Sequence, residues 1–183
     1  VSALLLAQSH PFIANLKDGD VLRSPVAIVR IGAPAGTMEV RREGGPVTVL
    51  KAVNQNSSAP LELKPGQNTI ILRQGPNTQK VKVTYSPAKS GFKVRVVYIQ
   101  AADEPNPTIM ELPGTTKKDV IDRISTAAKL MQGFCEDHFR IVEGKSKTFT
   151  LDYRSDGSVA IDFHRHKESG ASLRAKTGDQ LWG

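Results

Sequence analysis

The sequence is poor in residues that would crosslink it or build an aromatic core. Its 183 residues include a single cysteine, Cys135, and aromatic residues make up only 5% of the chain. One cysteine excludes an intrachain disulfide, and small secreted domains commonly depend on disulfides. A reducing, cytoplasmic compartment is therefore slightly favoured over secretion, and the core must be built mainly from aliphatic side chains.

Long hydrophobic runs and long runs of like charge are also missing. The apolar stretch Ala3–Ala7 is far shorter than the roughly 20 residues of a membrane-spanning helix. We expect it to form an edge strand, the alternative being the tail of a signal peptide. The formal net charge is +7, but the basic residues are scattered in pairs such as Arg41-Arg42. Without the aromatic stripe on which single strands stack, nucleic acid is not an expected partner, and electrostatic binding to it or to an anionic surface is the weakest hypothesis.

Short runs of β-branched or alternating residues fill the first hundred positions. Val26–Ile31 is rich in β-branched residues, and Lys80–Tyr85 alternates strictly between polar and apolar. Turn residues such as Lys64–Asn68 separate these runs. Strands at this spacing are typical of an antiparallel sandwich. The chain is therefore predicted to be mainly β, with an immunoglobulin-like antiparallel β-sandwich over residues 1–102.

One long amphipathic helix is predicted over about residues 116–139. Apolar residues recur there at steps of three, four and one, and Thr116 with Asp119 forms a variant of the capping box. The predicted apolar stripe consists of Val120, Ile124, Ala127, Ala128, Met131, Phe134, Cys135 and His138. We expect this stripe to be buried against another part of the chain, because a helix of this kind gains most of its stability from packing.

A β-hairpin is predicted after the helix, over about residues 147–166. Alternation from Lys147 to Arg154 and from Val159 to His166 flanks the turn Ser155–Ser158, whose Asp-Gly pair tolerates positive φ. Helix and hairpin together form an α+β segment over residues 103–183, which could open the N-terminal lobe of a protease.

No catalytic machinery can be recognised in the sequence. The nucleophile elbow GxSxG, the phosphate loop GxxxxGK[ST], the dinucleotide fingerprint GxGxxG and the zinc motif HExxH are all absent. Cys135 falls on the predicted apolar stripe, which favours a buried, unreactive thiol. We therefore assign no catalytic residue and no cofactor site.

His164 and His166 are the candidate metal ligands. On a strand, residues two apart place both imidazoles on one face, an arrangement found in some zinc sites. A third ligand is not evident in the sequence, and two solvent-facing histidines at a strand end explain the same pattern more simply.

Four blocks of the sequence resemble a known family. They are Val97–Pro105, Val120–Phe139, Phe149–Arg154 and Val159–His164, in this order behind a β-rich first hundred residues. The arrangement is similar to the N-terminal portion of a family of zinc metallopeptidases described mostly from fungi and other eukaryotes. In that family the activity is inferred from an HExxH helix downstream of the matched region. Because this sequence has no HExxH, the resemblance transfers no catalytic or zinc-binding residue and implies zinc only in a downstream domain.

The resemblance implies a non-catalytic accessory or substrate-positioning portion of a zinc metallopeptidase-like protein, with a protein or peptide as partner. The alternative is a free-standing β-sandwich module that binds protein or carbohydrate. The chain would be a metallopeptidase only together with a downstream HExxH domain, so its status as an enzyme is left open.

Overall fold

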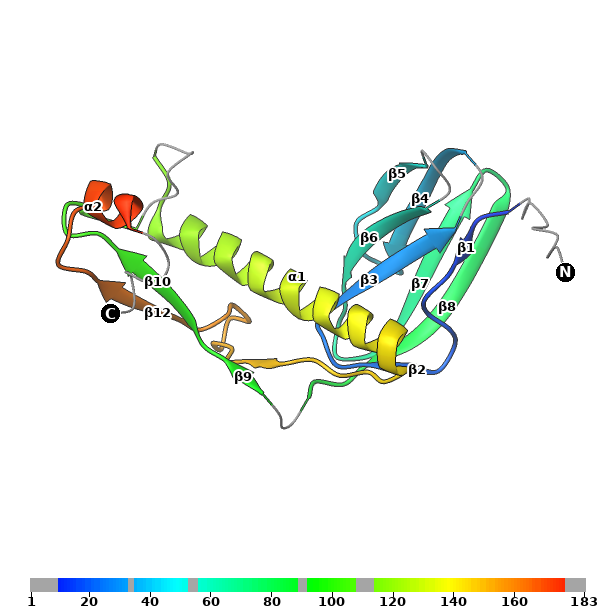
Figure 1. The fold of residues 1–183 in the computed structure, drawn as a ribbon. Helices are drawn as coiled ribbons and strands as arrows, with labels where there is room; N and C mark the ends of the chain where they lie inside the picture. Colours follow the sequence, from blue (N-terminus) through cyan, green and yellow to red (C-terminus); the bar gives the residue numbers. More distant parts are fainter. Residues whose placement is uncertain (1–9, 33–34, 53–55, 89–91, 108–113, 177–183) are drawn as a thin grey trace, which may run out of the picture. The chain divides into compact units, whose positions relative to one another are not determined.

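A computed structural model describes residues 10–32, 35–52, 56–88, 92–107 and 114–176. The stretch Ala3–Ala7, expected as an edge strand, lies outside them. The chain divides into two compact units, one built from residues up to Phe92 with Lys129–Thr150, the other from Lys93–Ala128 with the residues from Leu151 onward. The long helix α1 (Lys117–Glu143) begins in the second unit and ends in the first (Figure 1). None of the described helices combines the length and the apolarity needed to cross a membrane.

Two β-sheets make up most of the described part of the first unit. The three-stranded sheet has the order β1 (Phe12–Ile13), β3 (Val26–Gly32), β6 (Asn56–Glu62). The five-stranded sheet has the order β2 (Asp20–Leu22), β8 (Asn77–Tyr85), β7 (Gly66–Gln74), β4 (Gly36–Arg42), β5 (Thr48–Ala52). Neighbouring strands are antiparallel except β2 and β8, which are parallel. The predicted fold class, mainly β with a sandwich and one long helix, is confirmed.

The core between the two sheets is aliphatic, as the shortage of aromatic residues predicts. Its most buried members include Val29, Val40, Ile70 and Leu72, none of which exposes any measurable surface. Because successive side chains of a strand point to opposite faces, alternate residues of each strand line this core.

Strand β3 is buried on both of its faces. Ala27, Val29 and Ile31 point into the core, yet Val26 and Ile28 on the other face are buried as well. The C-terminal part of α1 covers that outer face, since a Cβ on Gly133 would lie within 2.6 Å of the Val26 carbonyl oxygen. The candidate site described below lies where this part of the helix meets β3.

The second unit is held together by a parallel strand pair. β10 (Val96–Gln100) pairs over five residues with β12 (Ile161–Arg165), and the rings of Tyr98 and Phe163 lie 5.4 Å apart across this pair. The short helix α2 (Gly170–Ala175) follows β12. Two further short strands, β9 (Lys93–Val94) and β11 (Thr150–Leu151), form a two-stranded sheet.

The predicted hairpin forms only next to its turn. Gly157 takes a positive φ of 80°, and a single antiparallel bridge joins Tyr153 to Val159. The longer pairing of residues 147–154 with 159–166 is absent, because β12 pairs with the distant β10 instead. Alternation along a strand shows which face is buried but not which strand lies beside it, so the sequence pattern alone could not identify this partner.

We expect Ser125→Ala to destabilise the second unit. The buried Ser125 hydroxyl oxygen accepts a hydrogen bond from the Val159 amide at 3.0 Å, and Val159 itself has no exposed surface. The substitution leaves a buried N–H unpaired, which costs about 1–3 kcal/mol. Thr126→Ala is the matched control, since Thr126 is exposed on the same helix. Chemical denaturation gives the stability of both variants, and amide hydrogen exchange shows whether the second unit is the part that is destabilised. Equal stability of the two variants would contradict the role given to the Ser125 hydrogen bond.

Candidate functional site

The C-terminal part of α1 turns a polar face, not an apolar one, toward the sandwich. Gly133, Glu136 and Asp137 are buried there, and the neighbouring Gln132, also buried, donates to the Phe149 carbonyl at 2.6 Å. The predicted apolar stripe is therefore wrong for this half of the helix. Of its members, Val120 and Ala128 are buried, Ile124 and Cys135 are half-buried, and Ala127, Met131, Phe134 and His138 are exposed.

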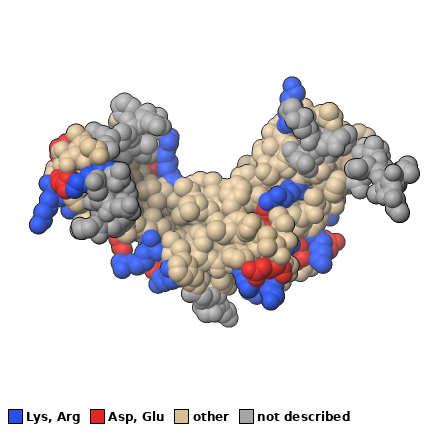
Figure 2. Space-filling view, in the orientation of Figure 1, with Lys and Arg blue, Asp and Glu red and all other residues tan. Residues whose placement is uncertain are grey.

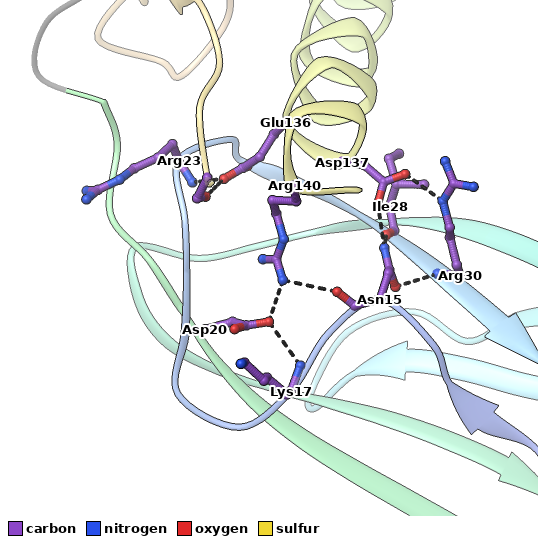
Figure 3. A network of polar contacts seen from close by, with 10 residues as sticks. Asn15, Lys17, Asp20, Arg23, Ile28, Arg30, Glu136, Asp137 and Arg140 are labelled. Carbon is purple, nitrogen blue, oxygen red and sulfur yellow. Dashed lines mark hydrogen bonds and ion pairs between the residues drawn. The ribbon is translucent and has the colours of Figure 1, made fainter. Parts of the chain in front are cut away.

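Glu136 supplies the first reason for this orientation. Its carboxylate accepts a hydrogen bond from the backbone amide of Arg23 at 2.6 Å (Figure 3). It also accepts from the Ser24 amide at 2.8 Å and from the Ser146 hydroxyl. The two amides lie in the connection between β2 and β3. Burial raises the pKa of Glu136 above its usual 4.5, because it disfavours the charged form. The three hydrogen bonds lower the pKa, but by less than burial raises it. Burial, and the nearby charge of Glu136, also raise the pKa of Tyr85.

Asp137 makes the second connection. It accepts hydrogen bonds from Asn15 Nδ2 at 2.6 Å and from Arg30 Nε at 2.7 Å. Asn15 in turn donates to the Ile28 carbonyl at 2.7 Å and accepts from the Arg30 amide at 2.9 Å. The carboxylate is thus tied to β3 and to the segment that follows β1.

Arg140 completes the arrangement one turn further along the helix. Its guanidinium donates to Asp20 Oδ2 at 2.5 Å and to the Asn15 carbonyl at 3.0 Å. Both charged side chains are largely buried, with exposed fractions of 15% and 12%. A buried ion pair of this kind is stable only with such additional hydrogen bonds. We call Glu136, Asp137 and Arg140 with their partners Asn15, Asp20, Arg23, Ser24, Arg30 and Ser146 the helix clamp.

Gly133 allows the helix to come close enough for the clamp to form. A Cβ at this position would lie 2.6 Å from the Val26 carbonyl oxygen, closer than such atoms approach in folded proteins. The position therefore excludes every side chain larger than hydrogen, although glycine is otherwise disfavoured inside a helix.

A surface pocket of about 600 Å³ lies beside the clamp, within the first unit. Its lining residues are Ala14, Asn15, Lys17, Asp20, Val21, Arg30, Arg140, Ile141, Gly144 and Ser146. The Lys17 ammonium forms no hydrogen bond or ion pair with any described residue, and Arg30, half exposed, uses only Nε in its contact with Asp137. Val21 and Ile141 add exposed apolar surface. The pocket therefore offers cationic donors beside apolar walls.

The sequence-predicted metal ligands lie in the second unit. His164 is exposed on β12, and His166 follows the strand, half-buried, with Nδ1 accepting from the Glu168 amide at 3.1 Å. Across the part of the chain that the structure describes, no group of three or more His, Cys, Asp or Glu residues is placed to hold a metal. Zinc binding by the two histidines stays a prediction.

The residues of the clamp were missed in the sequence, although a signal for them exists. Gly133, Glu136, Asp137 and Arg140 follow at steps of three, one and three, which places them on one helical face opposite the apolar one. Such a polar stripe is ordinarily taken as the solvated side of a helix. Only the contacts of the folded chain reveal it as the buried side.

Comparison with known proteins identifies one relationship. A family model described as "Putative peptidase family" matches residues 10–177, which is nearly the whole chain. No curated protein and no solved structure matches.

We expect Gly133→Ala to destabilise the first unit by about 1–3 kcal/mol, because the added methyl group must displace the backbone of Val26. Helix propensity alone predicts the opposite sign, a gain of about 1 kcal/mol. Thermal or chemical denaturation distinguishes the two. Met131→Ala, at an exposed position of the same helix, is the control and should leave the free energy of unfolding within about 0.5 kcal/mol. A stabilised Gly133→Ala protein would show that the helix does not approach β3 this closely.

We expect Glu136→Gln to cost about 1–3 kcal/mol of unfolding free energy. The amide nitrogen of glutamine is a donor, so it faces the Arg23 or Ser24 amide where the carboxylate accepted a bond. Glu143→Gln is the matched control, since Glu143 is exposed and its one ion pair among the described residues, with Lys147, is worth about 0–1 kcal/mol. Equal denaturation midpoints for the two variants would contradict the clamp.

Proposed function

The chain belongs to this peptidase family, and we propose that it supplies a non-catalytic part that positions a polypeptide substrate or partner for a zinc-dependent catalytic domain. The proposal assigns this chain recognition and assigns bond cleavage to residues outside it. It follows from what the acidic side chains of the described site do.

The observation that carries the proposal is that the carboxylates of Glu136 and Asp137 are occupied by structural hydrogen bonds. These are the most deeply buried carboxylates of the candidate site, and each already accepts from two or three donors. A general base must be free to take a proton from water or substrate within hydrogen-bond reach. Carboxylates engaged in this way hold the helix on the sandwich and are not available for that chemistry.

The pocket supports a role in recognition. Its walls come from the segment after β1, from β2, from β3 and from the end of α1, all of which the clamp holds together. Sites whose polar groups are fixed by surrounding hydrogen bonds bind with less loss of conformational entropy. Cationic and amide groups beside apolar walls are suited to a polypeptide, which presents both carbonyl or carboxylate oxygens and apolar side chains.

Zinc would belong to the catalytic domain in this proposal. In zinc peptidases the metal activates water and polarises the scissile carbonyl. No residue of this chain is assigned to that step. The pair His164 and His166 is kept as a separate zinc proposal, to be tested on the same sample.

We expect the purified chain to bind an unfolded polypeptide, reduced and alkylated α-lactalbumin, without cleaving it, whether or not zinc is added. Fluorescence anisotropy measures the binding and mass spectrometry detects fragments, while elemental analysis gives the zinc content. Cleavage that a chelator abolishes would overturn the non-catalytic assignment, and absence of binding would overturn the positioning role. If zinc is bound, its loss in His164→Ala and His166→Ala but not in His138→Ala would establish the histidine pair as ligands.

A further inference from the structure

The outward face of α1 is apolar along the whole length that packs on the sandwich. Met131, Phe134, Ile141 and Val142 keep 62%, 53%, 53% and 66% of their surface exposed, and His138 is exposed among them. At about 100° per residue these five positions fall within an arc of roughly 100°, and the centre of that arc lies roughly 140° around the helix from the centre of the arc that Glu136, Asp137 and Arg140 occupy. Because the clamp determines which face turns inward, the apolar face is forced outward and has no partner among the described residues.

This apolar face runs into the cationic pocket. Ile141 belongs to both, and Val21, 40% exposed, lies on the pocket wall with it. Lys17 lies in the same pocket with its ammonium unpaired among the described residues. We call Met131, Phe134, His138, Ile141 and Val142, together with Val21 and Lys17, the docking strip.

We propose that the docking strip binds a polypeptide segment in which apolar residues are accompanied by acidic ones. The apolar side chains would cover Met131, Phe134 and Ile141, and a carboxylate would pair with Lys17. This inference rests on the proposed function, since it names the chemistry of the polypeptide that is positioned. Contiguous exposed apolar surface rimmed by polar groups is typical of such interfaces.

Charge complementarity selects the occupant. Two carboxylates of the helix clamp, Asp20 and Asp137, are already paired with Arg140 and Arg30. The Lys17 ammonium is not paired with any described residue, since the neighbouring Asp18 carboxylate accepts from the Lys82 amide at 2.6 Å instead. A net charge of +7 adds to the attraction for an acidic segment.

Two other occupants fit these observations less well. Nucleic acid requires a track of cations along the phosphates, whereas the helical part of the strip contains neither Lys nor Arg. In the view of Figure 2, Lys and Arg are dispersed and Asp and Glu lie among them. A second copy of the chain would cover the apolar face but would bring another unpaired Lys17 and no free carboxylate from its own clamp.

The test uses three fluorescein-labelled 12-residue peptides and the complete chain. The first contains leucine and glutamate, the second lysine in place of glutamate, and the third serine in place of leucine. Fluorescence anisotropy is expected to show binding of the first peptide only. Phe134→Ala and Ile141→Ala should each weaken that binding about tenfold, as loss of an apolar anchor does. Lys17→Ala should weaken it several-fold and make it less sensitive to salt.

Matched controls come from strand β5 of the same unit. Val49→Ala removes an equally exposed apolar side chain and Lys51→Ala an exposed cation, and neither should change the affinity. Denaturation midpoints of Phe134→Ala, Ile141→Ala and Lys17→Ala should stay near that of the unmodified chain, which separates lost binding from lost folding.

Each contrary result has a definite meaning. Unchanged affinity in Phe134→Ala, Ile141→Ala and Lys17→Ala would overturn the docking strip while leaving the positioning role intact. Binding of unfolded α-lactalbumin without binding of the leucine–glutamate peptide would overturn the acidic, apolar chemistry. If no polypeptide binds at all, the proposed function fails together with this inference. Self-association by analytical ultracentrifugation that Phe134→Ala abolishes would make the strip an interface between copies of the chain.

Discussion

The burial of two carboxylates, Glu136 and Asp137, at one face of α1 is the constraint on which the first unit depends. An ionised group removed from water is tolerated only when donors surround it, and here backbone amides, Asn15, Arg30 and Ser146 supply them. The contact also stabilises the amides of Arg23 and Ser24, because buried N–H groups need acceptors and the Glu136 carboxylate supplies one to each. Helix and sandwich are therefore held by reciprocal polar contacts around the close approach at Gly133.

This constraint has a consequence for the opposite side of the helix. A helix can turn only one of two opposed faces inward, so fixing the polar one inward exposes Met131, Phe134 and Ile141. The exposed face is thus not accidental surface but the direct complement of the clamp. The proposed recognition role joins both sides of the helix, since the carboxylates of the clamp stabilise the structure while the apolar side chains of the opposite side remain exposed.

Several features could be predicted from local sequence patterns. Alternation such as that of Lys80–Tyr85 identified strands because side chains of a strand alternate between a buried and an exposed face. The helix over about residues 116–139 was predicted from its period and its capping residues, and its N-terminal hydrogen bonds between Thr116 and Asp119 are present. The candidate site could not be predicted in this way. Its members come from sequence positions more than a hundred residues apart, as with Arg23 and Glu136 or Asp20 and Arg140.

The sequence by itself determined the mainly β character, the aliphatic core and the presence of one long helix, because each depends on the periodicity of neighbouring residues. Tertiary structure alone decided which face of that helix is buried, and which strand pairs with β12. Both depend on the chemical groups that a distant segment presents. Unpaired amides and cationic side chains near β3 select the carboxylates of α1 over its apolar residues, and no pattern within the helix carries that information.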